Sequence, residues 1–86
     1  MGLLQSLLKV LIMIEVNARR LLCPMPVIRL QDAIEPLAVG EKVHITCTDP
    51  GVTNDIPAWC RINGHEIISS DHDELEYTFT VRKVEA

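Results

Sequence analysis

Cys23 is the residue with the clearest potential for chemistry, because two prolines follow it in the run Cys23-Pro24-Met25-Pro26. Proline is tolerated in the first turn of a helix, where its missing N–H would have no partner anyway. Apolar residues continue the run at helical spacing: Val27, Leu30, Ile34 and Leu37. The pattern predicts a helix whose first residue is Pro24, with Pro26 in its first turn and Cys23 at the N-cap.

This position predicts a reactive thiol. Free backbone N–H groups and the positive end of the helix dipole stabilise a thiolate and lower its pKa. Arg19 and Arg20 come just before Cys23 and add positive charge. The alternative is a small apolar residue buried under the helix start, as most free cysteines are. The helix start, the prolines and the arginines together favour a nucleophilic Cys23.

The other two cysteines carry weaker signals. Cys47 alternates with β-branched residues and is expected in the core, where free cysteine behaves as a small hydrophobe. Cys60 falls inside a predicted helix, without the advantage of the dipole, so we expect it partly buried beside Trp59 rather than reactive. No two cysteines have C-x-x-C spacing, and the histidines are scattered, so we expect no metal site and no cofactor.

Two polar residues, Asp55 and His65, are candidates for positioning the loop or for docking a partner. Ordinary capping and surface roles explain both well enough and are favoured, so neither is assigned as a general base.

The composition bounds the function. The chain has 86 residues, 48% of them hydrophobic, which indicates one small folded domain. Its net charge of −4 and its single Trp, Tyr and Phe argue against nucleic acid as a direct partner. An odd number of cysteines without disulfide spacing is typical of the reducing cytoplasm.

Residues 1–12 carry leucines at helical spacing. The run is shorter than the roughly 20 apolar residues that span a membrane, and it lacks the basic start and the cleavage site of a secretory signal. We expect an extension outside the core fold, which would occupy residues 13–86. Such an apolar strip would dock on the domain or drive self-association.

The elements that would position Cys23 follow from periodicity and from turn residues. Strands are predicted over 13–17, 42–48, 65–71 and 75–84, and helices over 24–37 and 52–63. Asp49 is the expected N-cap of the second helix. Pro57 lies within that helix, so either the helix is kinked or Asp55 caps a second start.

The resulting order is βαβαββ. Parallel strands joined across a helix have a right-handed crossover, and alternating rather than wholly apolar strands leave one sheet face open. We therefore predict a two-layer α/β sandwich, with a mixed four-stranded sheet and both helices on one face. Cys23 would lie where the first strand turns into the first helix, a usual location for a site.

Several short motifs occur in an order that resembles the TusA/SirA-like sulfur carrier family. They cover residues 13–84 and read Leu22-Cys23-Pro24-Met25-Pro26, Gly40-Glu41, Asp49-Pro50-Gly51, Asp55-Ile56-Pro57, Cys60, Gly64-His65 and Arg82-Lys83. The resemblance implies a fold like the C-terminal domain of translation initiation factor three.

The resemblance also implies a role for Cys23. It would accept sulfane sulfur from a cysteine desulfurase or a rhodanese-like protein and hold it as a persulfide. It would then pass the sulfur to an acceptor relay protein. Destinations in the family are tRNA thiolation, molybdenum cofactor maturation and sulfur oxidation, and the sequence does not choose among them.

The chain departs from the family pattern just before the motif. Members commonly have Asp-Ala-x-Gly-Leu there, whereas this chain reads Asn17-Ala18-Arg19-Arg20-Leu21. An arginine in place of glycine is strained if the position needs a positive φ. The added positive charge is expected to favour a thiolate or persulfide anion.

Two other readings of the sequence stay open. One is a thiol redox sensor that pairs Cys23 with Cys60, and the other is a non-catalytic domain that binds RNA or protein. The acidic balance weighs against RNA.

Overall fold

The computed structural model describes residues 13–84. Its elements, in chain order, are β1 (Ile14–Ala18), α2 (Met25–Ile34), β2 (Lys42–Cys47), α3 (Val52–Asn63), β3 (Glu66–His72) and β4 (Tyr77–Arg82). This is the predicted βαβαββ order. The extension predicted for residues 1–12 lies outside the described residues.

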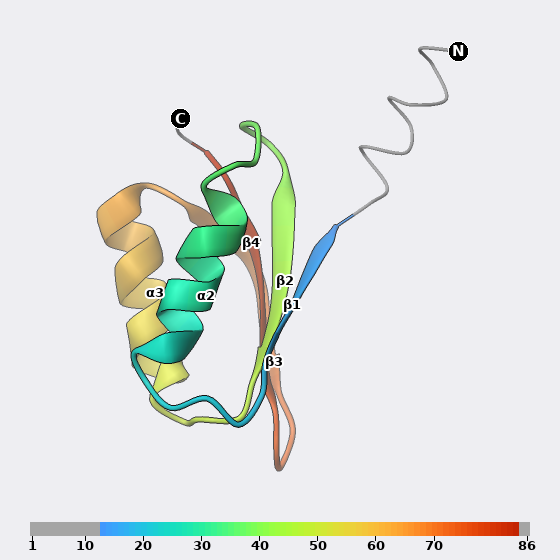
Figure 1. Ribbon diagram of the computed structural model, residues 1–86, viewed down its shortest axis with the longest axis vertical. Helices are drawn as coiled ribbons and strands as arrows, with labels where there is room; N and C mark the ends of the chain where they lie inside the picture. The colour runs from blue at the N-terminus through green and yellow to red at the C-terminus, as the bar shows by residue number, and fades with distance from the viewer. Residues whose placement is uncertain (1–12, 85–86) are drawn as a thin grey trace.

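The four strands form one mixed sheet in the order β1-β2-β4-β3. Strand β1 runs parallel to β2, whereas β4 is antiparallel to both of its neighbours, β2 and β3. Both helices lie on the same face of the sheet, so the predicted two-layer sandwich is confirmed (Figure 1). The parallel β1–α2–β2 unit brings the carboxyl ends of β1 and β2 together.

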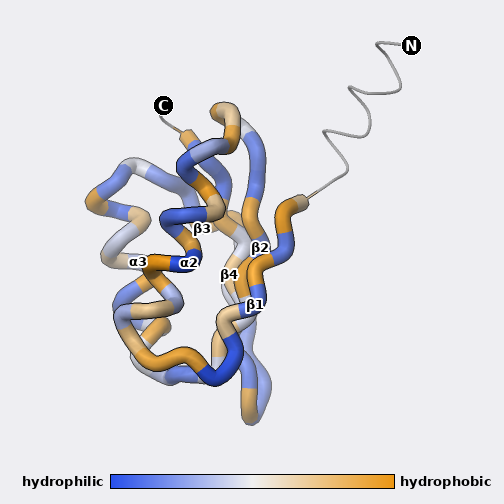
Figure 2. Tube along the Cα trace, in the orientation of Figure 1, coloured by the Kyte–Doolittle hydropathy of each residue, from blue (hydrophilic) through white to orange (hydrophobic). Residues whose placement is uncertain are grey.

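The core lies between this face of the sheet and the helices. Alternate residues of the two central strands point into it, and Val43 and Ile45 of β2 pair with Val81 and Phe79 of β4. The helices contribute Leu30, Ile34, Val52, Ile56 and Cys60. The edge strand β1 shows the same alternation along its length (Figure 2).

Helix α2 differs from the prediction at both ends. It begins at Met25 with Pro24 as the N-cap, so Cys23 lies one residue before the cap rather than at it. The helix ends at Ile34, not at Leu37, because Pro36 has no N–H to continue it. Pro26 is buried in the first turn, as expected.

Helix α3 has the predicted bounds but a different start. Gly51 is the N-cap, and Asp49 makes no side-chain cap to this helix. Pro57 lies inside one continuous helix, so the alternative in which Asp55 caps a second start is wrong. Gly64 ends the helix in the left-handed conformation, with φ 75°. Within residues 13–84, the helices are too short or too polar for any of them to traverse a bilayer.

Candidate functional site

Cys23 lies in the loop that joins β1 to α2, at the carboxyl end of β1 (Figure 1). Its side chain is half-buried and packs against the edge of the core. The peptide bond between Cys23 and Pro24 is cis. Cys47 and Cys60 are free thiols too, but both are buried. Cys23 is therefore the cysteine that a partner protein can reach.

Asp49 fixes the backbone of Cys23. The N–H of Cys23 donates to Asp49 Oδ2 at 2.8 Å, and the N–H of Gly51 donates to Asp49 Oδ1 at 3.0 Å. One carboxylate thus joins the loop before α2 to the loop before α3. Sequence reasoning missed this role, because the bond to Cys23 spans 26 residues of chain. The Asp-Pro-Gly turn signals only the local bond to Gly51.

The surroundings of the Cys23 thiol raise its pKa, whereas the sequence predicted that the pKa would be lowered. Hydrogen bonding to the Asp55 carboxylate, then burial, then hydrogen bonding to Asp49 and its negative charge raise the pKa of Cys23 to about 12. The prediction of a lowered pKa was therefore wrong, because two acidic side chains outweigh the start of the helix.

The same bonds act on Asp49 in the opposite direction. Donation from the backbone N–H groups of Gly51 and Cys23 holds the pKa of the Asp49 carboxyl below its ordinary value. Asp49 is therefore ionised at neutral pH.

Gly51 leaves room for the sulfur. A β-carbon at this position would lie 3.1 Å from Sγ of Cys23, closer than such contacts normally are. Gly51 has a helical backbone, with φ −59° and ψ −22°, which any residue adopts. The space around Sγ, rather than the backbone, is therefore what calls for a glycine here.

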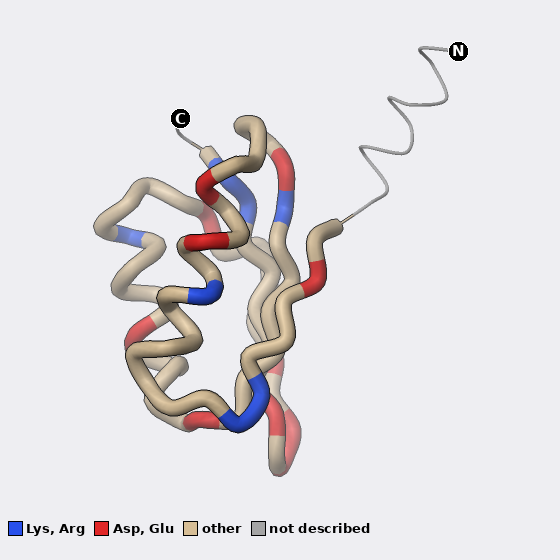
Figure 3. The backbone as a smooth tube through the Cα atoms, in the orientation of Figure 1, with Lys and Arg blue, Asp and Glu red and all other residues tan. Residues whose placement is uncertain are grey.

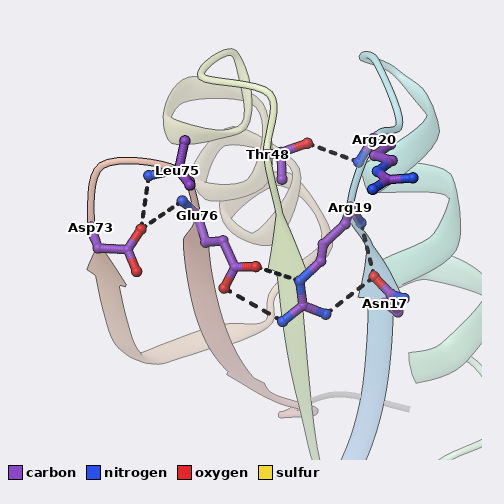
Figure 4. A network of polar contacts seen from close by, with 7 residues as sticks. All are labelled: Asn17, Arg19, Arg20, Thr48, Asp73, Leu75 and Glu76. Atoms are coloured by element: carbon purple, nitrogen blue, oxygen red, sulfur yellow. Dashed lines mark hydrogen bonds and ion pairs between the residues drawn. The ribbon is translucent and has the colours of Figure 1, made fainter.

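The loop before Cys23 is anchored at successive residues (Figure 4). The guanidinium of Arg19 pairs with the carboxylate of Glu76, next to the start of β4, and also contacts Asn17 Oδ1 at 3.3 Å. The backbone N–H of Arg20 donates to Thr48 Oγ1 at 2.8 Å. These contacts hold the loop against β2 and against the β3–β4 hairpin.

The two arginines differ from expectation in an informative way. Arg20 has a φ of 65°, so this position does need the left-handed conformation that glycine adopts freely. Arg19 pairs with Glu76, so its charge is directed at the β3–β4 hairpin rather than at the thiol. Acidic residues gather in that hairpin (Figure 3). The predicted electrostatic support for a Cys23 thiolate is therefore not what the structure provides.

The other predicted residues, Asp55, Cys60 and His65, lie along α3 or just after its end. Cys60 faces the core, and burial raises its pKa to about 11. His65 follows the C-terminus of α3 and packs on Trp59, with 5.2 Å between the ring centroids. Asp55 lies in the first turn of the same helix, so about 15 Å of helix separates the two. The structure brings Asp55 to Cys23 but leaves His65 at the opposite end.

His65 also lines a surface pocket of about 320 Å³ between the C-terminal ends of both helices and the residue after β4. Its polar neighbours there include Glu35, Asn63 and Lys83. Among residues 13–84, no three His, Cys, Asp or Glu side chains are grouped so that they could hold a metal ion.

Comparison with known proteins agrees with the fold and with the predicted family. The family model described as sulfurtransferase TusA matches residues 14–83. The crystal structure of a SirA-like protein from Desulfitobacterium hafniense superposes with a TM-score of 0.74 at 23% sequence identity. The match covers 85% of this chain and 100% of that chain, and it shows a shared fold. Because the family match spans the sheet, both helices and the Cys23 loop, the chain belongs to the TusA sulfurtransferase family.

Proposed function

We propose that the protein is a sulfur carrier that accepts sulfane sulfur as a persulfide on Cys23 and hands it to an acceptor protein. The observation that carries the proposal is the placement of Cys23. It is half-buried in a loop anchored by Asp49, in a chain of a sulfurtransferase family, whereas Cys47 and Cys60 are buried. A carrier needs an accessible sulfur held in a fixed position, and this loop supplies one.

The partners would be two proteins, one that donates sulfur to Cys23 and one that accepts sulfur from it. A cysteine desulfurase or a rhodanese-like protein would donate the sulfur, and a sulfur-relay protein would accept it. The net charge of −4 disfavours direct binding to nucleic acid, so a role in tRNA thiolation would run through a further protein. Molybdenum cofactor maturation and sulfur oxidation are the other destinations that family membership allows.

The setting of this relay is the cytoplasm, because the three cysteines are free thiols and a reducing compartment keeps them so. Residues 13–86 would form the carrier domain, with residues 1–12 as an extension outside it. A redox sensor that pairs Cys23 with Cys60 has less support, because the Cys60 side chain is only 2% exposed and its thiol pKa is raised to about 11.

Intact-mass measurement tests the proposal. The protein is incubated with a cysteine desulfurase, its cofactor and cysteine, and in parallel with a rhodanese-like donor. The wild type is expected to gain the mass of one sulfur atom, which a reducing agent then removes. Cys23→Ser is expected to gain none. The control Cys60→Ala keeps Cys23 and should gain sulfur as the wild type does.

The proposal fails if a panel of both donor classes leaves the wild type unmodified while Cys23 still reacts with an alkylating agent. It also fails if Cys23→Ser gains sulfur as efficiently as the wild type does.

A further inference from the structure

The sulfur of Cys23 is enclosed on one side by the start of α3. Asp49 holds the Cys23 backbone through a 2.8 Å hydrogen bond, and Gly51 lies against Sγ with no side chain between them. Asp55 lies in the first turn of α3, where its backbone N–H donates to the carbonyl of Gly51 at 3.1 Å, so it stands one turn from the glycine that lies against Sγ. The groups that face Sγ are thus two carboxylates and a glycine.

The charge of Arg19 is engaged away from the thiol. Arg19 pairs with Glu76, and Arg20 is held by its backbone on Thr48. A thiol that donates to carboxylates is satisfied, whereas a thiolate in the same place would face two negative charges. The raised pKa of Cys23 agrees with this balance.

We propose that Asp55 and Asp49 are positioning residues that hold the empty carrier as a thiol, and that loading with sulfur relieves this restraint. The proposal rests on the proposed function, since it concerns the same Cys23. The two carboxylates would thus hold the sulfur protonated in the empty carrier and would not restrain the sulfur of the loaded carrier.

The chemistry of loading provides the physical reason. A bond forms between Sγ and the outer sulfur of the donor persulfide, and the S–S bond of the donor breaks. The proton of Sγ goes to the departing donor sulfur, which leaves as a thiol, so no oxidant or reductant is consumed. Sγ then carries no proton. The group that now ionises is the outer sulfur, which is about 2 Å farther along an S–S bond.

The empty form is tested by alkylation with iodoacetamide, which reacts with the thiolate. Modification of Cys23 is followed by mass from about pH 6 to about pH 10, where the reactive thiolate is a minor fraction that grows with pH. We expect Asp55→Asn to react about tenfold faster than the wild type at neutral pH, with its profile shifted about one pH unit lower. Asp49→Asn should shift the profile in the same direction. The control Asp32→Asn, on the exposed side of α2, should leave it unchanged.

The loaded form is tested after persulfide formation with inorganic polysulfide, so no donor protein is required. Here Asp55→Asn is expected to react within about twofold of the wild type, because the reactive sulfur lies beyond the carboxylates. The proposal is overturned if Asp55→Asn fails to accelerate alkylation of the empty form. It is equally overturned if the empty and loaded forms are accelerated alike. Failure of every protein donor to load Cys23 would instead count against the proposed function.

Discussion

Single residues decide how much space and how much freedom the sulfur of Cys23 has. Gly51 provides the space, because a β-carbon there would lie 3.1 Å from Sγ. Arg20 limits the freedom of the preceding loop, since its φ of 65° is held by the bond from its N–H to Thr48. Both positions can be changed without altering Cys23 itself.

Gly51→Ala should slow the loading of Cys23 without unfolding the protein. The helical backbone of Gly51 accepts alanine, so the added methyl group acts mainly on Sγ and on the nearby Asp49 carboxylate. Because small misplacements of a reacting atom are costly, we expect the rate of persulfide formation to fall roughly three- to tenfold. Mass spectrometry of a loading time course measures this rate. Asn54→Ala, on the exposed side of the same first turn, is the control and should load at the wild-type rate.

The prediction is contradicted if Gly51→Ala is folded, as its far-UV circular dichroism spectrum would show, and yet loads as fast as the wild type. The space that Gly51 leaves beside Sγ would then not affect loading.

Arg20→Gly should stabilise the fold. A left-handed conformation costs a residue with a β-carbon about 1–2 kcal/mol, and glycine removes this cost. Part of the stabilisation is lost again, because glycine gives the unfolded chain more entropy. We expect the free energy of unfolding to rise by up to about 1 kcal/mol, measured by urea denaturation. Arg20→Ala removes the charge but keeps the β-carbon, so it should show no such gain. Equal stabilisation by both variants would point to charge rather than backbone.

At the scale of elements, Asp49 ties the loop before α2 to the loop before α3. Its two oxygens accept the N–H groups of Cys23 and Gly51 at 2.8 and 3.0 Å. The ion pair between Arg19 and Glu76 is a second connection, which joins the Cys23 loop to the hairpin of β3 and β4. The position of Cys23 thus depends on contacts between connections as well as on α2.

Asp49→Asn should lower stability in a pH-dependent way. The folded protein holds the pKa of Asp49 below its unfolded value of about 3.9, so the ionised carboxylate adds stability above that pH. This stability is lost as the pH falls through the folded pKa. We therefore expect the variant to be less stable than the wild type at pH 7, and the difference to shrink below about pH 4.

Urea unfolding at several pH values measures this difference, with Asp32→Asn as the exposed control. A deficit that stays constant down to about pH 2 would show that the charge of Asp49 is not what joins the loops.

The sequence predicted elements better than it predicted the site. The alternation of Val43, Ile45 and Cys47 placed the core face of β2, and the bounds of α3 were also predicted, because local periodicity and Gly64 carry that information. The direction of the Cys23 pKa was missed because it depends on Asp49 and Asp55, which come from a distant segment. The N-cap of α2 was missed by one residue, since Pro24 is the cap and Met25 the first helical residue.

At the scale of the whole molecule, the site rests on a core that covers only one face of the sheet. Leu30 of α2 is completely buried, between the helices and the sheet. It connects the helix that follows Cys23 to the strands that carry the loop. The stability of this core and the chemistry of the sulfur should therefore be separable by mutation.

Leu30→Ala should cost about 2–5 kcal/mol of unfolding free energy, because it leaves a cavity in a closed core. Urea denaturation checks this value. The control Ile28→Ala lies on the same helix at 41% exposure and should change stability by roughly 0.5 kcal/mol or less. Equal effects of the two substitutions would contradict the assignment of Leu30 to the core.

The measurement that bears most directly on the central claim is the location of transferred sulfur by peptide mapping. The protein is loaded from a donor supplied with isotopically labelled cysteine and is then digested with trypsin without reduction. Cleavage after Arg20 and Arg29 isolates Cys23 in the peptide 21–29, whereas Cys47 and Cys60 share the peptide 43–61. We predict the label on the Cys23 peptide alone. Label on the other peptide, or none on the Cys23 peptide of a loaded protein, would contradict a carrier that works through Cys23.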